Sequence, residues 1–155
     1  MKNTILSLIL VLFVSACSHK TESNVTTNNV STDTPQPEAA AQKTAAQKSA
    51  EQWLALVDAA NYAESWKTAA GYFQTAVPQD QWEHTIAAVR GPLGDLVSRK
   101  LKSAHYTKSL PGAPDGEYVV LQFDTSFTNK KTAVETVTPM LDTDGTWKVS
   151  GYYIK

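Results

Sequence analysis

In the middle of the chain, apolar side chains recur at intervals of three and four residues. Three sets of this kind run through residues 50–57, 62–73 and 82–89. The spacing places each set on one face of an α-helix and predicts three amphipathic helices. Asn61 stands where it would cap the second helix, and Gly91-Pro92 ends the third.

After Gly94 the pattern changes to alternating apolar and polar residues, which is typical of β-strands. The predicted strands cover residues 101–110, 117–127, 133–141 and 147–154. Turn-forming residues separate them, so neighbouring strands are expected to form hairpins. Helices followed by hairpins predict an α+β fold, in which three N-terminal helices pack on one face of a four-stranded, twisted antiparallel sheet.

The alternation also predicts which side of two strands is buried. In the second strand this face carries Val119, Leu121, Phe123 and Phe127. In the last strand it carries Trp147, Val149, Gly151 and Tyr153. Pro139 lacks an N–H for the strand ladder, so it predicts an edge or a bulge in the third strand.

The start of the chain has the order of a secretory signal peptide. Lys2 precedes the segment Ile5–Phe13, which is apolar except for Ser7, and small residues follow. This apolar segment is shorter than the roughly 20 residues that a membrane-spanning helix needs. We therefore expect residues 1–16 to be a cleaved signal peptide rather than a permanent membrane span.

The end of this segment, Val14-Ser15-Ala16-Cys17, resembles the lipobox of bacterial lipoproteins. The resemblance implies that the Cys17 thiol takes a diacylglyceryl group and that its freed amine takes a further acyl chain, such as palmitate. Two buried chains hold a protein stably at a membrane. Ser18 follows in place of the Asp that retains such proteins in the inner membrane, which implies the periplasmic leaflet of the outer membrane. The alternative is an ordinary secreted protein with an unmodified Cys17.

Between the lipobox and the first helix the composition is strongly polar. Ser, Thr, Asn, Gln and Pro dominate, and only Val25 and Val30 are apolar from position 18 to 38. Such a segment buries too little apolar surface to offset the entropy of ordering, so it predicts a flexible tether. The predicted organisation is a signal peptide at 1–16, an acylated Cys and tether at 17–38, and an α+β domain at 39–155.

Four segments together resemble a bacterial family of uncharacterised proteins, the domain of unknown function 4019. They are 53–58, 62–66, 90–94 and the closing 145–153, with Gly-x-Trp-x-Val-x-Gly at its core. The resemblance covers roughly Ala46 to Lys155. The order of helices and strands, with this closing motif, also resembles the cone-shaped fold of nuclear-transport-factor-two-like proteins. Because the first family has no assigned activity, neither resemblance implies a catalytic residue.

Motifs for catalysis, metals or cofactors are missing from the chain. It has no glycine-rich phosphate loop, no His-Glu-x-x-His and no Gly-x-Ser-x-Gly. Asp142-x-Asp144-Gly145 lacks the spacing of a calcium loop and predicts a plain turn. We expect no catalytic constellation, no cofactor and no metal. The net charge of −1 also argues against a nucleic-acid partner.

Two residues are candidates for chemistry on the domain itself. His105 in the first strand is the candidate acid–base group of a pocket, with Asp124 or Glu135 as its carboxylate partner. The alternative is a surface histidine without a partner. Arg90 ends the third predicted helix and is a candidate for anion capture. Alternatively, it complements the helix C-terminus and pairs with a nearby carboxylate.

A basic strip and the tryptophans give two further hypotheses. Arg99, Lys100 and Lys102, with Lys108, lie on one strand, where they either protect an edge or contact anionic envelope polymers. Four Trp and six Tyr suggest carbohydrate binding. However, three of the Trp residues lie on the helix stripes and are better explained by core packing: Trp53, Trp66 and Trp82.

We therefore expect a non-enzymatic lipoprotein, held to membrane lipid by acylated Cys17, whose α+β domain binds an envelope protein or glycan through its sheet face. The alternative is a small-ligand-binding or enzymatic cone-fold protein with a pocket between helices and sheet. The two differ in a simple structural property. A ligand-binding protein needs a roomy, partly polar cavity, whereas aromatic side chains that fill this space favour binding at the outer surface.

Overall fold

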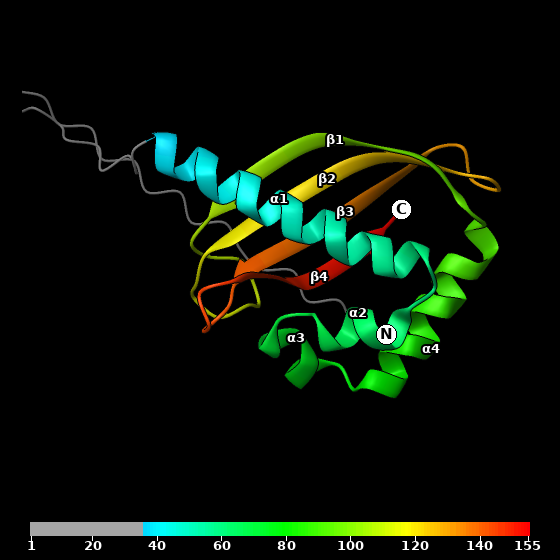
Figure 1. Ribbon diagram of the computed structural model, residues 1–155, viewed down its shortest axis with the longest axis horizontal. Coiled ribbons are helices and arrows are strands. Elements are labelled where there is room, and N and C mark those ends of the chain that lie inside the picture. The colour runs from blue at the N-terminus through cyan, green and yellow to red at the C-terminus, as the bar shows by residue number, and fades with distance from the viewer. Residues whose placement is uncertain (1–35) are drawn as a thin grey trace, which may run out of the picture. The chain divides into compact units, whose positions relative to one another are not determined.

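The computed structural model describes residues 36–155, which form helices followed by a sheet (Figure 1). The helices are α1 (Gln36–Asp58), α2 (Tyr62–Lys67), α3 (Gly71–Ala76), α4 (Gln79–Arg90) and the short 3-10 helix η1 (Gly91–Leu93). The strands are β1 (Leu96–Thr107), β2 (Tyr118–Phe127), β3 (Ala133–Leu141) and β4 (Trp147–Ile154). The predicted α+β class is confirmed. The predictions on the signal peptide and Cys17 lie outside the described residues.

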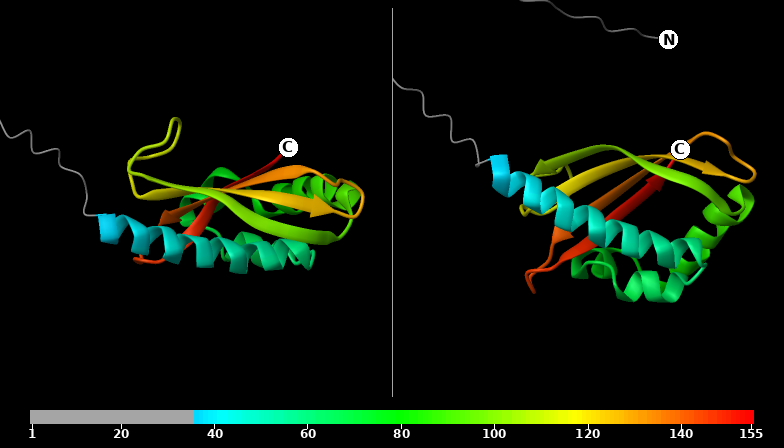
Figure 2. Two further views of the ribbon diagram at one scale, coloured as in Figure 1. Left: turned by 90° about the horizontal axis from the view of Figure 1, so that it is seen from above. Right: turned by 45° about the horizontal axis from the view of Figure 1, so that its top comes forward.

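The sheet is antiparallel, with the strands in the order β1-β2-β3-β4. Helix α1 crosses one face and contacts all four strands, and α3 packs against β4 (Figures 1 and 2). Within residues 36–155, no helix is both long enough and apolar enough to cross a membrane. Helix α1 begins at Gln36, so it extends three residues into the segment that was predicted to be tether.

The core lies between α1 and the sheet and is rich in aromatic rings. Trp53 and Trp82 have ring centroids 5.7 Å apart, and Phe73 meets the edge of Trp82 at 5.1 Å. Both indole N–H groups are satisfied by one buried residue: Trp53 donates to the Ser65 carbonyl and Trp82 to its hydroxyl. The prediction that helix-stripe tryptophans pack in the core is confirmed for Trp53 and Trp82, whereas Trp66 is partly buried and packs against the core from its side.

The predicted second helix is in fact two short helices, α2 and α3. The break follows from two tertiary hydrogen bonds. The Ala70 N–H donates to the Val149 carbonyl of β4 at 2.9 Å, and the Gly71 N–H donates to Asp142 Oδ2 at 3.1 Å. Helix α3 therefore starts anew against the β3–β4 hairpin. Asn61 precedes α2 as expected but makes no side-chain capping bond.

The strand boundaries agree well with the sequence pattern, with one exception. Strands β3 and β4 match the predicted ranges, and β2 starts one residue later than predicted. Strand β1 begins at Leu96 rather than at Leu101, and it therefore includes Arg99. The register of β1 shifts twice, between Leu96 and Ser98 and between Leu101 and Ser103. These bulges hide its alternation from a simple period-two reading.

One predicted face is wrong beyond a bulge in the β3–β4 pair. The register shifts between Thr138 and Pro139, as the proline predicted. Trp147 and Val149 face the helices as expected, but after the bulge Tyr152 faces the core and Tyr153 is 61% exposed. One extra residue moves every following side chain to the other face.

One residue of the third predicted helix also differs from its predicted position. Val89 is exposed, contrary to the apolar stripe predicted for α4.

Candidate functional site

Four charged side chains meet at the C-terminal end of α1. Asp58 ends α1, Arg90 ends α4, Arg99 lies on β1 and Glu135 on β3. The Arg90 guanidinium donates to Asp58 at 2.7 Å and to Glu135 at 3.4 Å. Arg99 donates to Asp58 at 2.7 and 3.0 Å and to Glu135 at 2.6 and 3.1 Å. We call these four residues the charge network.

The charge network is largely buried, with 19% of the Asp58 side chain and 12% of the Arg99 side chain still exposed. Glu135 has no exposed surface and Arg90 only 5%. Two hydroxyl groups donate further hydrogen bonds to the Glu135 carboxylate, Thr125 at 2.7 Å and Tyr152 at 2.6 Å. The Arg90 guanidinium also stacks on Phe127, 4.4 Å from the ring centroid. Two positive and two negative charges cancel, which meets the requirement that buried ions be paired and hydrogen-bonded.

The protonation states follow from this environment. Burial acts to lower the pKa of Arg99, but its hydrogen bonds and charge interactions with Asp58 and Glu135 outweigh this effect and raise it. Burial, followed by the negative charge of Glu135, raises the pKa of Tyr152 above its usual range. Tyr152 therefore keeps its proton and remains a hydrogen-bond donor.

A small cleft opens beside Asp58 and Arg90. Its volume of about 180 Å³ lies below the roughly 300 Å³ at which the volumes of ligand pockets begin.

The structure separates the residues that were predicted to form a basic strip. Arg99 points toward the helices and joins the charge network. Lys100 is exposed, and Lys102 pairs with Asp124 at 3.0 Å across a half-exposed surface. A continuous basic strip containing Arg99 is therefore not formed. The pairing of Arg90 with carboxylates is present, but its partners come from α1 and β3 rather than from its own helix end.

His105 does not lie in a pocket. It is exposed and pairs with Val120 in the β1–β2 ladder, whereas its neighbour Ala104 pairs with the buried Leu121. His105 therefore points to the side of the sheet opposite to Glu135. Its side chain makes no hydrogen bond or ion pair within residues 36–155 and therefore does not pair with Asp124 either. The predicted partnership of His105 with Glu135 is wrong, because the second bulge of β1 decides which face each side chain takes.

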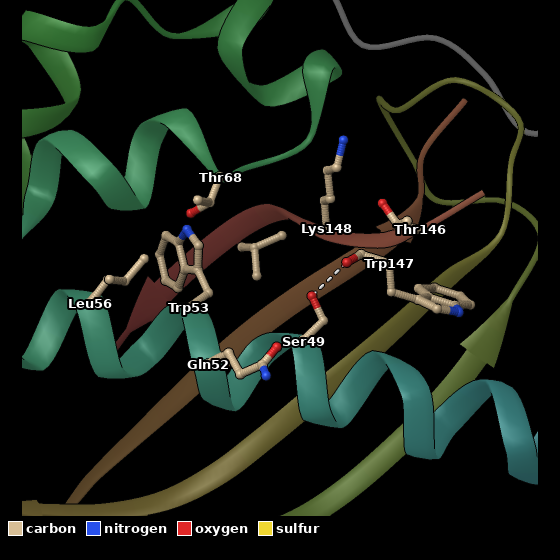
Figure 3. A pocket seen from close by; sticks show the side chains of 9 residues that line it. Ser49, Gln52, Trp53, Leu56, Thr68, Thr146, Trp147 and Lys148 are labelled. Carbon is tan, nitrogen blue, oxygen red and sulfur yellow. Dashed lines mark hydrogen bonds between the residues drawn. The ribbon is translucent and has the colours of Figure 1, made fainter. Parts of the chain in front are cut away.

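A groove opens between α1 and β4, and the residues that form it come from three segments (Figure 3). Its volume is about 500 Å³. Helix α1 contributes Ser49, Gln52, Trp53 and Leu56, and the α2–α3 connection contributes Thr68. The last residue of the β3–β4 turn contributes Thr146, and the start of β4 contributes Trp147, Lys148 and Val149. We call this feature the α1–β4 groove.

The hydroxyl groups of the groove have already committed their protons. Ser49 donates to the Trp147 carbonyl at 2.6 Å (Figure 3). Thr68 donates to the Glu64 carbonyl at 2.8 Å, and Thr146 to Asp144 at 2.6 Å. A hydroxyl group has two lone pairs besides its proton. These three oxygens therefore remain available as hydrogen-bond acceptors.

Lys148, the cation beside the groove, is neutralised by the β3–β4 hairpin. Its ammonium lies 2.5 Å from Asp144 and 3.3 Å from Asp142. The bond to Asp144 raises the pKa of Lys148, and the same contact, with Thr146, lowers the pKa of Asp144 to about 2. The N–H groups of Thr143 and Gly71 lower the pKa of Asp142. Lys148 therefore presents little free charge to a ligand.

A metal site is not part of this arrangement. Among residues 36–155, no three His, Cys, Asp or Glu side chains come together in a way that would hold a metal ion. The sequence reasoning anticipated Arg90 and Arg99 individually, but it did not anticipate Asp58 as a partner. It missed the groove entirely. Its one sequence signal is the closing Gly-x-Trp-x-Val-x-Gly motif, which supplies Trp147 and Val149.

The fold and these two polar regions define an α+β domain with a neutralised charge network inside and an open groove outside. The family described as "Protein of unknown function (DUF4019)" matches residues 49–152, and the chain belongs to this family. The match includes both the charge network and the groove. Comparisons with curated proteins and with solved structures find no match. The resemblance to the cone-shaped fold therefore stays a prediction.

Proposed function

We propose that this protein is a lipid-anchored, non-catalytic binding module of the bacterial envelope. The observation that carries the proposal is the contrast between a filled interior and an open groove. The space between α1 and the sheet holds packed side chains, including Trp53, Trp82 and Phe123. The α1–β4 groove opens at the edge of that packing, where Trp53 and Val149 form part of its lining, and provides the binding surface.

The filled interior argues against catalysis at the charge network. An acid–base catalyst needs a titratable group that can exchange a proton with a bound substrate. Both oxygens of Glu135 accept hydrogen bonds from protein groups, and Asp58 is held by two guanidinium groups. His105 lies on the exposed face of the sheet, away from these residues.

The anchor part of the proposal rests on the lipobox at residues 14–17. An acylated Cys17 would place the protein at the periplasmic leaflet of the outer membrane. The test is membrane fractionation of the full chain with Cys17→Ala, and with Ser18→Ala as the matched control that keeps the acylated thiol. We expect the first variant to leave the detergent-extractable membrane fraction and the second to remain in it. A Cys17→Ala protein that still fractionates with membrane would contradict the anchor.

The binding part is tested by site-specific crosslinking in the intact envelope. A photo-reactive residue at Gln52, on the groove rim, is compared with one at His105 on the opposite sheet face. We expect a discrete crosslinked product from position 52 and none from position 105. Equal labelling at both positions would show that the groove is not the binding surface.

A further inference from the structure

We propose that the α1–β4 groove binds a neutral, hydroxyl-rich saccharide. The inference rests on the proposed binding function and names its ligand class. The hydrogen bonds, charges and apolar surface of the residues in Figure 3 support it. Its volume of about 500 Å³ lies within the range of roughly 300–1,000 Å³ that is typical of ligand sites.

The hydrogen-bonding character of the groove selects a ligand that donates. Ser49, Thr68 and Thr146 have committed their protons to protein oxygens, as described above, so each offers only lone pairs. Gln52 is exposed on the rim and has no side-chain hydrogen bond among the described residues. Its amide offers both a donor and an acceptor. Saccharide hydroxyl groups match this set because each can donate one proton and accept at the same time.

The charges of the groove select a neutral ligand. Among the lining residues, Lys148 carries the one formal charge, and Asp142 and Asp144 already neutralise it. A carboxylate or phosphate group in the groove would lie close to these two aspartates without a free cation. A ligand cation would find its carboxylates occupied by Lys148. Placing an unpaired charge there is costly, whereas a neutral hydroxyl compound avoids that cost.

The apolar part of the groove fits the other half of a sugar ring. Leu56 and Trp147 are partly exposed and contribute carbon surface beside the hydroxyl acceptors, while the buried Trp53 and Val149 form the floor beneath them. A pyranose carries hydroxyl groups around its rim and C–H groups on its faces. It can therefore cover apolar side chains while it donates to Ser49, Thr68 and Thr146.

Strand addition by a peptide is disfavoured at the same place. An added strand would need free backbone groups along the β4 edge. The Trp147 carbonyl already accepts from Ser49, and the Val149 carbonyl already accepts from the Ala70 N–H at 2.9 Å. The backbone acceptors of β4 that face the groove are therefore in use, which leaves the side-chain oxygens for recognition.

The test is a titration of the full chain, in detergent, with three probes. Tetramers of glucose and of N-acetylglucosamine are the neutral probes, and a tetramer of galacturonic acid is the anionic comparison. Tryptophan fluorescence reports binding, because Trp53 and Trp147 line the groove. We expect at least one neutral tetramer to bind more tightly than the anionic one. No binding by either neutral probe, or tighter binding of the anionic probe, overturns the inference.

Two pairs of variants locate the binding. Thr146→Val removes a groove acceptor, and its control Thr143→Val changes an exposed residue of the same hairpin that is outside the groove lining. Gln52→Ala is paired with Glu51→Ala, its exposed neighbour on α1. We expect affinity to fall about three- to tenfold in each groove variant, which is the effect of one lost hydrogen bond, and to be unchanged in each control. Equal effects within both pairs overturn the inference.

The same experiments separate failure of this inference from failure of the proposed function. A specific crosslink from position 52 to an envelope protein, together with no binding of any saccharide in the titration, would overturn the saccharide inference. The proposed binding function would still be supported. Release of new reducing ends from a neutral tetramer would support the saccharide site while contradicting a non-catalytic role.

Discussion

The charge network and the α1–β4 groove are both built on α1, yet they satisfy their polar groups in opposite ways. At the network, protein donors surround each carboxylate, and Glu135 and Arg90 are buried while Asp58 and Arg99 are only partly exposed. At the groove, the hydroxyl groups of Ser49 and Thr146 donate to protein oxygens, and no protein donor occupies their lone pairs among the described residues. A polar cluster completed by the protein itself supports the fold, whereas one that is left incomplete can recognise a ligand.

Burial explains why the two regions differ. An ion in a low-dielectric interior is stable only if every charge has a partner, so the network must be closed. Side chains on the groove rim, such as Gln52 and Thr146, are exposed and water satisfies them in the absence of a ligand. Substitutions in the charge network should therefore mainly lower the stability of the fold. Substitutions in the groove should mainly lower the affinity for a ligand.

The largest expected effect is the replacement Glu135→Gln. The change leaves two buried guanidinium groups with only Asp58 as a counter-ion, so we expect the free energy of unfolding to fall by about 3–5 kcal/mol. Urea denaturation measures it. Glu51→Gln, at an exposed position on α1, is the control and should change stability by less than about 0.5 kcal/mol. A loss below about 1 kcal/mol for Glu135→Gln would show that the network is not essential to the fold.

A smaller effect is expected for Arg90→Lys. The variant keeps the positive charge but loses the planar fork that reaches both Asp58 and Glu135 and stacks on Phe127. We expect a loss of roughly 1.5–3 kcal/mol, the contribution of hydrogen bonds to charged groups. Thermal unfolding measures it, with Lys100→Arg as the exposed control. Unchanged stability together with weaker anion binding would instead favour Arg90 as an anion-capturing residue.

The Asp142 contact should make stability depend on pH. Its pKa in the folded protein lies below the ordinary value of 3.8 because it accepts from Thr143 and Gly71. A lowered pKa stabilises the fold above pH 3.8, and this contribution is lost as the pH falls through the folded-state pKa. We expect Asp142→Asn to cost about 1 kcal/mol at pH 7 and progressively less below pH 4.

Denaturation curves from pH 2.5 to pH 7 test this expectation, with Asp115→Asn in an exposed loop as the control. If the difference in the free energy of unfolding between the wild type and Asp142→Asn stays constant over this range, the charge of Asp142 does not stabilise the contact between α3 and the hairpin.

The smallest effect is expected for His105→Ala. This side chain is exposed, lies on the face away from the network, and is not a lining residue of the groove. We expect changes within about 0.5 kcal/mol in stability and no change in saccharide affinity. Chemical denaturation and the same titration measure both. A clear loss of binding would assign a binding role to the outer sheet face and would contradict the α1–β4 groove as the binding surface.

Local patterns along the chain predicted most helices and strands correctly. The alternation in β2 and the stripe through Ala50, Trp53 and Val57 describe side chains that pack in the core as expected. These predictions succeed because the period of a regular element follows from its own backbone geometry. They fail where a bulge changes the period, as between Thr138 and Pro139, where Tyr152 rather than Tyr153 is directed into the core.

The candidate sites were less accessible to such reasoning. Arg90 and Arg99 were recognised as notable residues, but Asp58 and Glu135 stand 32 and 45 positions from Arg90. A pattern with a period of a few residues contains no information on such distant pairs. The groove is a similar case, since Ser49 and the Trp147 carbonyl that it binds are 98 positions apart.

The amino-acid sequence alone established the class of fold and the bounds of most strands. Both of these depend on neighbouring residues, which a chain displays before it folds. The partners of each charge, the division of α2 from α3 and the α1–β4 groove depended on packing. They form when the helices pack against the sheet, because this packing brings residues far apart in the sequence within hydrogen-bonding distance.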